Sequence, residues 1–513
     1  MSVREIISSY DQPIILGLTP YSRTRVTISD AAVTPDWPPY IDSVRLSRYD
    51  EYTKLIENAA QDVFRSLQLS VEQKSKIAIA VAIPELLCNV WADAVWSDPP
   101  TLEFTSDEIK NRWDVVDRAT NWSESLAWES VFGSAGWGTS VLYLRRDESR
   151  VAEFGTSVVI DEIDPAIYFP VLKPGSSREI DRVVLAWEED RAAPDGTPEI
   201  WQIREFHYLD AGQYHIATQE RRSSSGLSVH AFRTVKEEAP EGVDFLPFID
   251  MHAKRWRGRY WGVSEISRIM SLLDELDNTV SNIAEILEYH GKPMLQVPAS
   301  VIYGGTLTKG ADKTLGIRRA DEADIARYIT FDGMIDSQLA HLDKTLELIM
   351  LTSEVPRTYF GLGTESAPPS GVSLKLQLQN YLKKAGRWQR NETARLNTLV
   401  PMALRLDGAL GDSVAKAVVP EVRHGSPLPA DDEQEVRIIT AANAAGIMSK
   451  KSAVTVLKRL GYVDDVDDEL DEIQSEKEDS IAALPAAFSG NFGGGGQPAN
   501  SSTDPNAGEQ PPA

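Results

Sequence analysis

Few residues in this sequence have the spacing of a catalytic, phosphate-binding or metal-binding motif. Gly361, Gly363 and Gly371 could suggest a phosphate cradle, but the sequence contains no Gly-x-x-x-x-Gly-Lys-[Ser/Thr] loop. The seven histidines are scattered, without His-Glu-x-x-His or another paired ligand spacing, and no Gly-x-Ser-x-Gly elbow is present. We therefore expect no catalytic residue, no metal site and no cofactor, and we interpret the protein as a non-enzyme.

Two further candidates favour structural roles. Cys88 is the one cysteine and lies in the apolar run that begins at Ile83, which is typical of a buried thiol rather than a nucleophile. A single cysteine allows no disulfide within the chain and fits a reducing cytoplasm. The acidic run from Asp464 to Glu472 lacks the spacing of a calcium loop, so we expect a solvated face there.

Positive charge gathers in one helical stretch, whose role the sequence leaves open. The stretch could contact DNA or an acidic partner, but a solvated face or ion pairs between subunits are favoured; its residues are Lys383, Lys384, Arg387, Arg390 and Arg395. Residues 442–461 could be a DNA-reading helix-turn-helix, but the acidic run beside them favours structural helices. The formal net charge of −25 argues against tight DNA binding, because affinity for phosphate comes from Lys and Arg.

The N-terminus lacks a basic stretch followed by an apolar run, so we expect no signal peptide. No run approaches 18 uncharged apolar residues, which predicts a soluble, cytoplasmic protein without a membrane span.

The first 260 residues read as an α+β fold. Helical spacing covers residues 52–67 and 105–134, and strand-like pieces cover 139–144, 157–160, 182–187 and 200–208. A different pattern follows, in which Ser264 is a candidate N-cap for a helix over 264–289. Its apolar positions repeat at 3-4 spacing, the narrow stripe of helices packed side by side; they are Ile266, Ile269, Leu273, Leu276, Val280, Ile283 and Leu287.

A second helix with the same spacing runs from Ile335 to about Pro356, through Leu339, Leu342 and Leu346. The two helices bracket a β-rich insertion, which predicts an arm with a compact tip. Both helices are acidic, through Asp274, Glu275, Asp277, Glu285, Glu288, Asp336, Asp343 and Glu347.

Beyond the second helix we expect a glycine- and proline-rich loop and a long helix over 372–406, kinked by Pro401. A strand over 417–423 and helices over 431–480 follow. From residue 489 the composition offers almost nothing to bury, which predicts a disordered tail.

This order of elements resembles the portal proteins of tailed double-stranded-DNA bacteriophages, of the siphophage type. The patterns that carry the resemblance stand in the family's order. They are Trp261-Gly262-Val263-Ser264-Glu265-Ile266, Gly291-Lys292-Pro293, Glu354-Val355-Pro356, Phe360-Gly361, Ser370-Gly371-Val372-Ser373-Leu374-Lys375 and Ala445-Gly446-Ile447-Met448-Ser449. Together they cover about residues 50–480.

The resemblance implies a portal fold and its domains. These would be a wing at 1–260, stem helices at 261–290 and 333–355, a clip at 291–332, a tunnel loop at 356–371, a long helix returning to the wing at 372–430, a crown at 431–480 and a disordered tail at 481–513. It also implies that the tunnel loop faces the channel, through Phe360, Gly361, Gly363, Glu365, Pro368, Pro369 and Gly371.

The resemblance further implies a ring, typically of twelve subunits, at one capsid vertex of the virion. Such a ring passes double-stranded DNA during packaging and ejection and contacts terminase, head-completion proteins, capsid and scaffold. Acidic stem helices would keep DNA centred by repulsion, which salt screens beyond about 8–10 Å. Two alternatives stay open: a head-tail adaptor or scaffold without a pore, and a packaging ATPase, which the missing phosphate loop disfavours.

Overall fold

The computed structural model divides the chain into two units, Met1–Pro427 and Leu428–Ala513. The residues that the structure describes are 42–58, 79–192, 198–222, 231–291, 294–298, 314–317, 327–329, 335–360, 376–427, 432–459, 462–463 and 465–476. None of the helices among them combines the length and the apolar character that crossing a bilayer requires.

The helical layer of the first unit packs around α5 (Ile83–Trp96), which has Pro84 in its first turn and whose buried side chains include Trp91 and Cys88. α5 packs against α7 (Ala127–Trp137) and α12 (Gln379–Asp407), and α2 (Ser43–Ile56) contacts both α5 and α7. Pro401 lies inside α12, which continues through it to Gly408.

α6 (Asp107–Thr120) shows how a local signal starts and ends a helix. The Ser106 hydroxyl accepts a hydrogen bond from the Ile109 backbone N–H, and Asn121 closes the helix in the left-handed conformation. A single π-helical turn, Trp122–Leu126, follows and leads into α7. The predicted helix over 105–134 is therefore two helices, because the backbone of Asn121 interrupts it.

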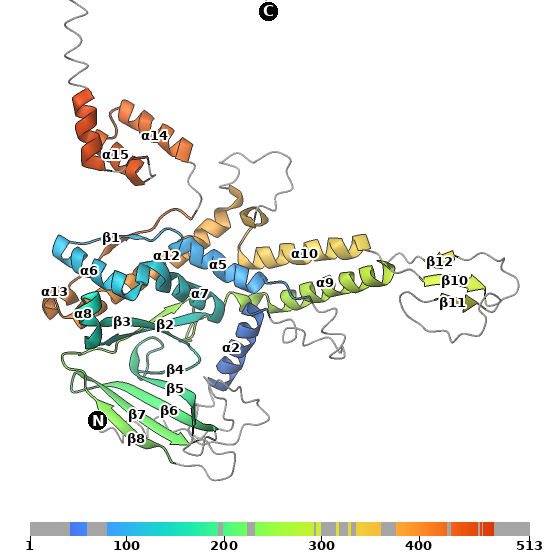
Figure 1. Ribbon diagram of the computed structural model, residues 1–513, viewed down its shortest axis with the longest axis horizontal. Coiled ribbons are helices and arrows are strands. Elements are labelled where there is room, and N and C mark those ends of the chain that lie inside the picture. Colours follow the sequence, from blue (N-terminus) through green and yellow to red (C-terminus); the bar gives the residue numbers. More distant parts are fainter. Residues whose placement is uncertain are drawn as a thin grey trace, which may run out of the picture. The chain divides into compact units, whose positions relative to one another are not determined.

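Two antiparallel sheets complete the core of the first unit (Figure 1). The smaller has the order β3-β2-β9, and the larger has the order β4-β5-β6-β7-β8. Their strands are β2 (Thr139–Arg146), β3 (Val158–Ile163), β4 (Tyr168–Leu172), β5 (Ile180–Ala192), β6 (Pro198–Asp210), β7 (Gln213–Arg222), β8 (Arg233–Glu238) and β9 (Phe248–His252). The short helices η4 (Glu148–Arg150) and α8 (Val151–Phe154) connect β2 to β3.

The sheets share an apolar cluster that includes Val141, Tyr168, Leu185, Phe248 and Tyr260. Three of the four strand-like pieces predicted from the sequence in this region lie within strands, and the fourth, 157–160, begins one residue before β3. The α+β class is confirmed too.

After β9 the chain forms an arm, which we define as α9 (Met270–Gly291), α10 (Ile335–Ser353) and the small sheet between them. α9 and α10 lie side by side and lead to and from that sheet (Figure 1). In it β10 (Met294–Pro298) pairs in parallel with β11 (Thr314–Ile317) and antiparallel with β12 (Arg327–Ile329). The two-helix arm with a β-rich insertion is therefore confirmed.

The predicted start of the first arm helix is wrong. A 3-10 turn, η5 (Ile266–Arg268), precedes α9; its N-cap residue is Glu265, and the Ser264 hydroxyl accepts a hydrogen bond from the Ile266 N–H. Ile269 then separates the turn from the α-helix. Ser264 therefore supports the turn and is not the N-cap of the helix.

The remaining elements return the chain to the core. η7 (Arg357–Phe360) follows α10, and after α12 come α13 (Asp412–Lys416) and β13 (Glu421–Arg423), which pairs antiparallel with β1 (Thr101–Glu103). The strand expected over 417–423 is thus only its last three residues. The helix predicted over 52–67 begins earlier, as α2, and ends at Ile56, where a turn follows; residues 59–67 lie outside the described residues.

In the second unit, α14 (Asp432–Ala444) and α15 (Lys450–Arg459) are separated by Gly446, whose φ is +72°. Helices were expected here. The predicted disordered tail lies outside the described residues.

Candidate functional site: the root of the arm

The chain enters the arm through a segment fixed to the C-terminal end of α7. The Glu265 N–H donates to the carbonyl of Ala135 at 3.0 Å, and the Ser264 hydroxyl donates to the carbonyl of Gly136 at 2.6 Å. Gly138 makes this approach possible, because its φ is +85° and an added Cβ would lie 2.7 Å from the Ser264 nitrogen. The first turn of the arm is therefore held by the core of the first unit.

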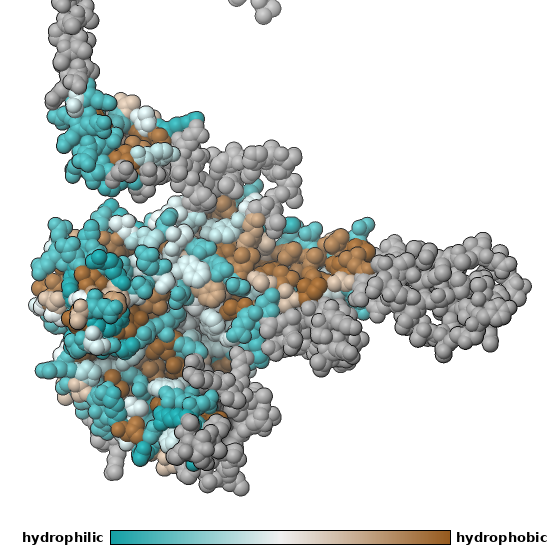
Figure 2. All heavy atoms as spheres, viewed as in Figure 1, coloured by the Kyte–Doolittle hydropathy of each residue, from teal (hydrophilic) through white to brown (hydrophobic). Residues whose placement is uncertain are grey.

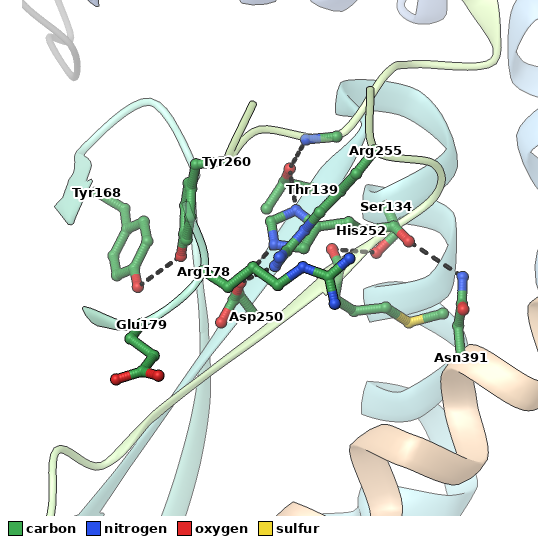
Figure 3. A network of polar contacts seen from close by, with 12 residues as sticks. Ser134, Thr139, Tyr168, Arg178, Glu179, Asp250, His252, Arg255, Tyr260 and Asn391 are labelled. Carbon is green, nitrogen blue, oxygen red and sulfur yellow. Dashed lines mark hydrogen bonds and ion pairs between the residues drawn. The ribbon is translucent and has the colours of Figure 1, made fainter. Parts of the chain in front are cut away.

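A polar network supports the same segment (Figure 3). The Gly262 N–H donates to the Thr139 hydroxyl at 3.0 Å, and this hydroxyl lies 2.9 Å from the His252 Nδ1. The other ring nitrogen, Nε2, contacts the Asp250 carboxylate, which also accepts from Arg255 at 3.0 Å. Burial lowers the pKa of His252, which favours a neutral ring that accepts from Thr139 at Nδ1 and donates to Asp250 at Nε2.

The order hydroxyl–imidazole–carboxylate in this network is also that of a nucleophile triad. Thr139, however, is fully buried, and its oxygen already accepts a hydrogen bond from Gly262. No attacking atom reaches solvent, so the arrangement can position backbone but offers no nucleophile to a substrate. Among the described residues, no three His, Cys, Asp or Glu side chains are placed to hold a metal ion.

Lys384 of α12 contacts both the segment that enters the arm and the end of α10. Its ammonium group donates to the Glu265 carboxylate at 2.6 Å and to the carbonyl of Ser353 at 2.9 Å, and it lies 4.2 Å from the Trp91 ring centroid. The side chains of the ion pair are only 5% and 9% exposed. Burial lowers the pKa of Lys384, and the Glu265 charge opposes that shift.

One helical turn further along α12, Arg387 makes a second link. Its guanidinium group donates to the Glu354 carboxylate at 2.7 Å. Glu354 is the residue after α10 and has the left-handed conformation, with φ at +64°. Lys384 and Arg387 therefore hold Glu265, which precedes the turn η5 that leads into the outgoing helix, and the residues that end the returning one. We call this set, Lys384, Arg387, Glu265, Ser353 and Glu354, the root clamp.

The basic stretch read from the sequence is thereby divided. Lys384 is buried, so its charge serves the root clamp rather than a surface contact. Arg395 is also buried, paired with Glu392 at 2.7 Å. Lys383, Arg387 and Arg390 are exposed, and contact with DNA or a partner stays a prediction for them.

The sequence held a signal for these buried charges. α12 buries Tyr381, Ala385, Trp388, Leu396 and Leu399, which follow one another at helical spacing. The charged residues Lys384, Glu392 and Arg395 stand on that same stripe, so the apolar residues around them indicate burial.

The apolar seam of α9 divides along its length. Ile266, Ile269, Leu273 and Leu276 are at most 1% exposed and pack within the subunit. Val280 and Ile283 are half-buried, and Leu287 is 52% exposed.

On α10, Leu342 and Leu346 are half-buried and Leu339 is 45% exposed. Two leucines outside the predicted seam, Leu348 and Leu351, are 42% and 74% exposed. Figure 2 shows apolar side chains gathered along this arm.

The acidic side chains of the arm differ in position. Asp277 is buried, accepts a hydrogen bond from the Val81 N–H at 3.0 Å, and has its pKa raised to about 6 by burial. Glu285 is half-buried, and the side chain of Glu288 lies outside the described residues. The exposed acids are Asp274, Glu275, Asp336, Asp343 and Glu347.

Some of these acids have basic partners. The Glu275 carboxylate lies 2.9 Å from His341 on the other arm helix, and Glu347 accepts from Lys344 at 2.7 Å. Of the tunnel-loop residues read from the sequence, Phe360 ends η7; Gly361, Gly363, Glu365, Pro368, Pro369 and Gly371 lie outside the described residues.

Comparison with known proteins decides the family. A model of the family described as "Phage portal protein, SPP1 Gp6-like" matches residues 38–483, which is most of the chain. The chain belongs to this phage portal protein family. The family is structural rather than enzymatic.

Solved structures with a similar chain include two gene transfer agent (GTA) particles. One is the neck of an empty GTA particle computed with C6 symmetry, at 12% identity and a TM-score of 0.41, covering 78% of this chain and 98% of that chain. The other is the virion of a native GTA particle, at 14% identity and a TM-score of 0.38, covering 79% and 99%. A search of curated proteins finds no match.

Proposed function

We propose that this portal-family chain is the subunit of a ring at one capsid vertex, through which double-stranded DNA passes during packaging and ejection. The observation that carries the proposal is the exposed apolar surface of the arm, at Leu287, Leu339, Leu348 and Leu351. Contiguous apolar surface on a soluble protein marks a site where another protein packs. Neighbouring copies in a ring would cover it.

The charge of the arm supports a channel that DNA slides through. The arm carries exposed carboxylates, and the whole chain has a formal net charge of −25. Such a surface repels phosphate instead of holding it. In this proposal the arm helices are the stem, the small sheet is the clip, residues 1–260 belong to the wing, and residues 356–371 form the tunnel loop facing the channel.

The remaining assignments follow from the same proposal. Residues 372–430 return to the wing, residues 431–480 form the crown, and residues 481–513 form a tail. The ring, of twelve subunits in the virion, would assemble in the host cytoplasm and then contact terminase, head-completion proteins, capsid and scaffold. None of these partners requires a catalytic group in this chain.

Native mass spectrometry and negative-stain microscopy of the full chain test the ring. We expect closed rings from the unaltered protein and single subunits from Leu339→Asp, because the substitution places a charge where a neighbour would pack. Leu209→Asp is the matched control, since Leu209 is similarly exposed, at 41%, on β6. Its rings should persist.

The outcomes separate clearly. A monomer or dimer at all concentrations, also with scaffold present, would overturn the ring. Normal rings from Leu339→Asp would overturn the assignment of the outer arm to the interface. Leu273→Asp is unsuitable for this test, because Leu273 is 1% exposed within its own subunit and its replacement unfolds the core.

A further inference from the structure

Between β9 and the arm the chain forms a short turn with a basic, aromatic tip, residues 254–259. The sequence here is Lys-Arg-Trp-Arg-Gly-Arg, with four cations in six residues and no acid. No other six consecutive residues of the chain hold four cations. Lys254, Arg257 and Arg259 are exposed, and Trp256 is 51% exposed.

The tip is held rigidly from its base. The Val263 N–H donates to the carbonyl of Lys254 at 2.7 Å, and Arg255 forms a β-bridge with Gly262. The Arg259 N–H closes the turn on the carbonyl of Trp256 at 3.1 Å, with φ of Gly258 at +75°.

Figure 3 shows the polar groups around Arg255, at the base of the tip. Arg255 binds Asp250, and the hydroxyls of Tyr168 and Tyr260 lie 3.3 Å apart. Because the base is fixed by these contacts, the tip is preorganised for a partner and loses little conformational entropy on binding.

The exposed cations of the tip have few partners within the described part of the chain. In the part of the chain that the structure describes, no carboxylate pairs with Lys254, Arg257 or Arg259, and Lys254 has only the Trp256 ring, at 5.3 Å. Other exposed arginines do pair, such as Arg145 with Asp161 at 2.8 Å. The tip therefore presents free positive charge around a half-exposed indole.

We propose that the tip docks on the C-terminal part of α10 in a neighbouring copy of this chain. The receiving strip consists of Asp343, Glu347, Leu348 and Leu351. Its carboxylate side chains are 64% and 48% exposed; each has one basic partner in its own subunit, Arg357 at 3.4 Å from Asp343 and Lys344 at 2.7 Å from Glu347, and each keeps solvent-facing surface for a second cation. Its leucines are the exposed ones described above. Trp256 packs on the leucines, and Arg257 and Arg259 meet the carboxylates, which gives an apolar centre with a charged rim. The inference rests on the proposed ring.

The root clamp explains why the two surfaces can meet. The tip lies a few residues before Glu265, and Leu351 lies two residues before Ser353, and Lys384 binds both Glu265 and Ser353. Tip and strip therefore belong to the same end of the arm. Rotation about a ring axis preserves height along that axis, so surfaces at the same end of the arm remain near one another in height in neighbouring copies.

A second copy fits the tip better than DNA does. Phosphate recognition uses the cations but gives the indole no partner, whereas Trp and Arg are enriched at the centres of protein interfaces. The net charge of −25 also repels a polyanion. Two copies repel each other for the same reason, so they can associate only where basic groups of one copy face acidic groups of the other.

Charge reversal of the full chain tests the proposal. R257E/R259E should raise the protein concentration at half-assembly by ~10-fold or more, because like charges then face each other. R233E/K236E is the control: it makes the same change in net charge on β8, at side chains 75% and 62% exposed. Circular dichroism at low concentration checks that both variants are folded.

Each outcome is decisive. Loss of rings in R257E/R259E, with rings retained in the control and recovered when D343R/E347R is added, supports the docking. Unchanged assembly of R257E/R259E overturns it. Unchanged assembly with lost binding to a duplex oligonucleotide overturns it in favour of DNA. If the unaltered chain forms no rings, the proposed function fails instead.

Discussion

Replacing Lys384 with Met tests whether the root clamp stabilises the fold. The substitution keeps an unbranched side chain against Trp91 but leaves the Glu265 carboxylate buried without its cation. Breaking a buried pair from one side costs ~3–5 kcal/mol, because an uncompensated charge stays in a low-dielectric site. The 2.6 Å ion pair and the lost bond to the Ser353 carbonyl place Lys384→Met in that range.

The matched control is Lys383→Met. Lys383 is the preceding residue of the same helix and is exposed, so the change in unfolding free energy should stay within ~0.5 kcal/mol. Adding Glu265→Gln to Lys384→Met should recover ~2 kcal/mol, because the buried carboxylate is then gone. The two sites should therefore be strongly coupled in a double-mutant cycle.

Urea unfolding followed by tryptophan fluorescence is the assay. All twelve tryptophans precede residue 428, so the signal reports the first unit alone. The measurement is made at a concentration where native mass spectrometry finds single subunits. A cost below ~1 kcal/mol for Lys384→Met, or additive effects of the two substitutions, would refute the clamp.

Two further predictions concern the core. Gly138→Ala should lower the free energy of unfolding by more than ~2 kcal/mol, because the new Cβ strains a left-handed backbone and approaches the Ser264 nitrogen. Gly212→Ala is the control: Gly212 has φ of +83° but open space around it, so the cost should be only ~1 kcal/mol. Equal thermal midpoints of the two variants would contradict the close approach at Gly138. Burial raises the pKa of Glu162 to about 7 from 4.5, so the folded chain keeps a proton that the unfolded chain releases. The contribution of Glu162 to stability therefore falls as pH rises from about 4.5 through about 7. In urea unfolding, Glu162→Gln should remove the part of the fall in midpoint between about pH 5 and pH 8 that this group causes. An unchanged dependence of the midpoint on pH would contradict the raised pKa.

The arm was readable from the sequence because its pattern is local. The 3-4 spacing from Ile266 to Leu287 predicts a long helix whatever lies around it, and the second stripe on α10 predicts a partner. The same pattern does not predict which of the seam residues are buried within the subunit. Leu273 and Leu287 occupy equivalent positions in it, yet one is 1% and the other 52% exposed, since the core of the first unit reaches only the inner part of α9.

Tertiary contacts also decided the features that sequence reasoning missed. Ser264 has the residue type of a helix cap, but the hydrogen bond of Glu265 to Ala135 draws the next residues into a 3-10 turn first. The basic stretch that contains Lys384 predicts a contact for DNA or an acidic partner, a solvated face, or ion pairs between subunits, and none of these is the role that Lys384 has. Its ion pair with Glu265 spans 119 residues, a separation that no local pattern encodes.

The pairing of β1 with β13 has a consequence for the synthesis of the chain. Thr101 lies opposite Arg423, so the ribbon closes a loop of about 320 residues. At about 5–20 residues per second the ribosome needs roughly 15–65 s between these two strands. During that time the edge of β1 and the face of α5 that packs on α12 have no partner. The first unit therefore completes its fold only after β13 has been synthesised, and until then the nascent chain exposes surfaces of the kind that chaperones bind.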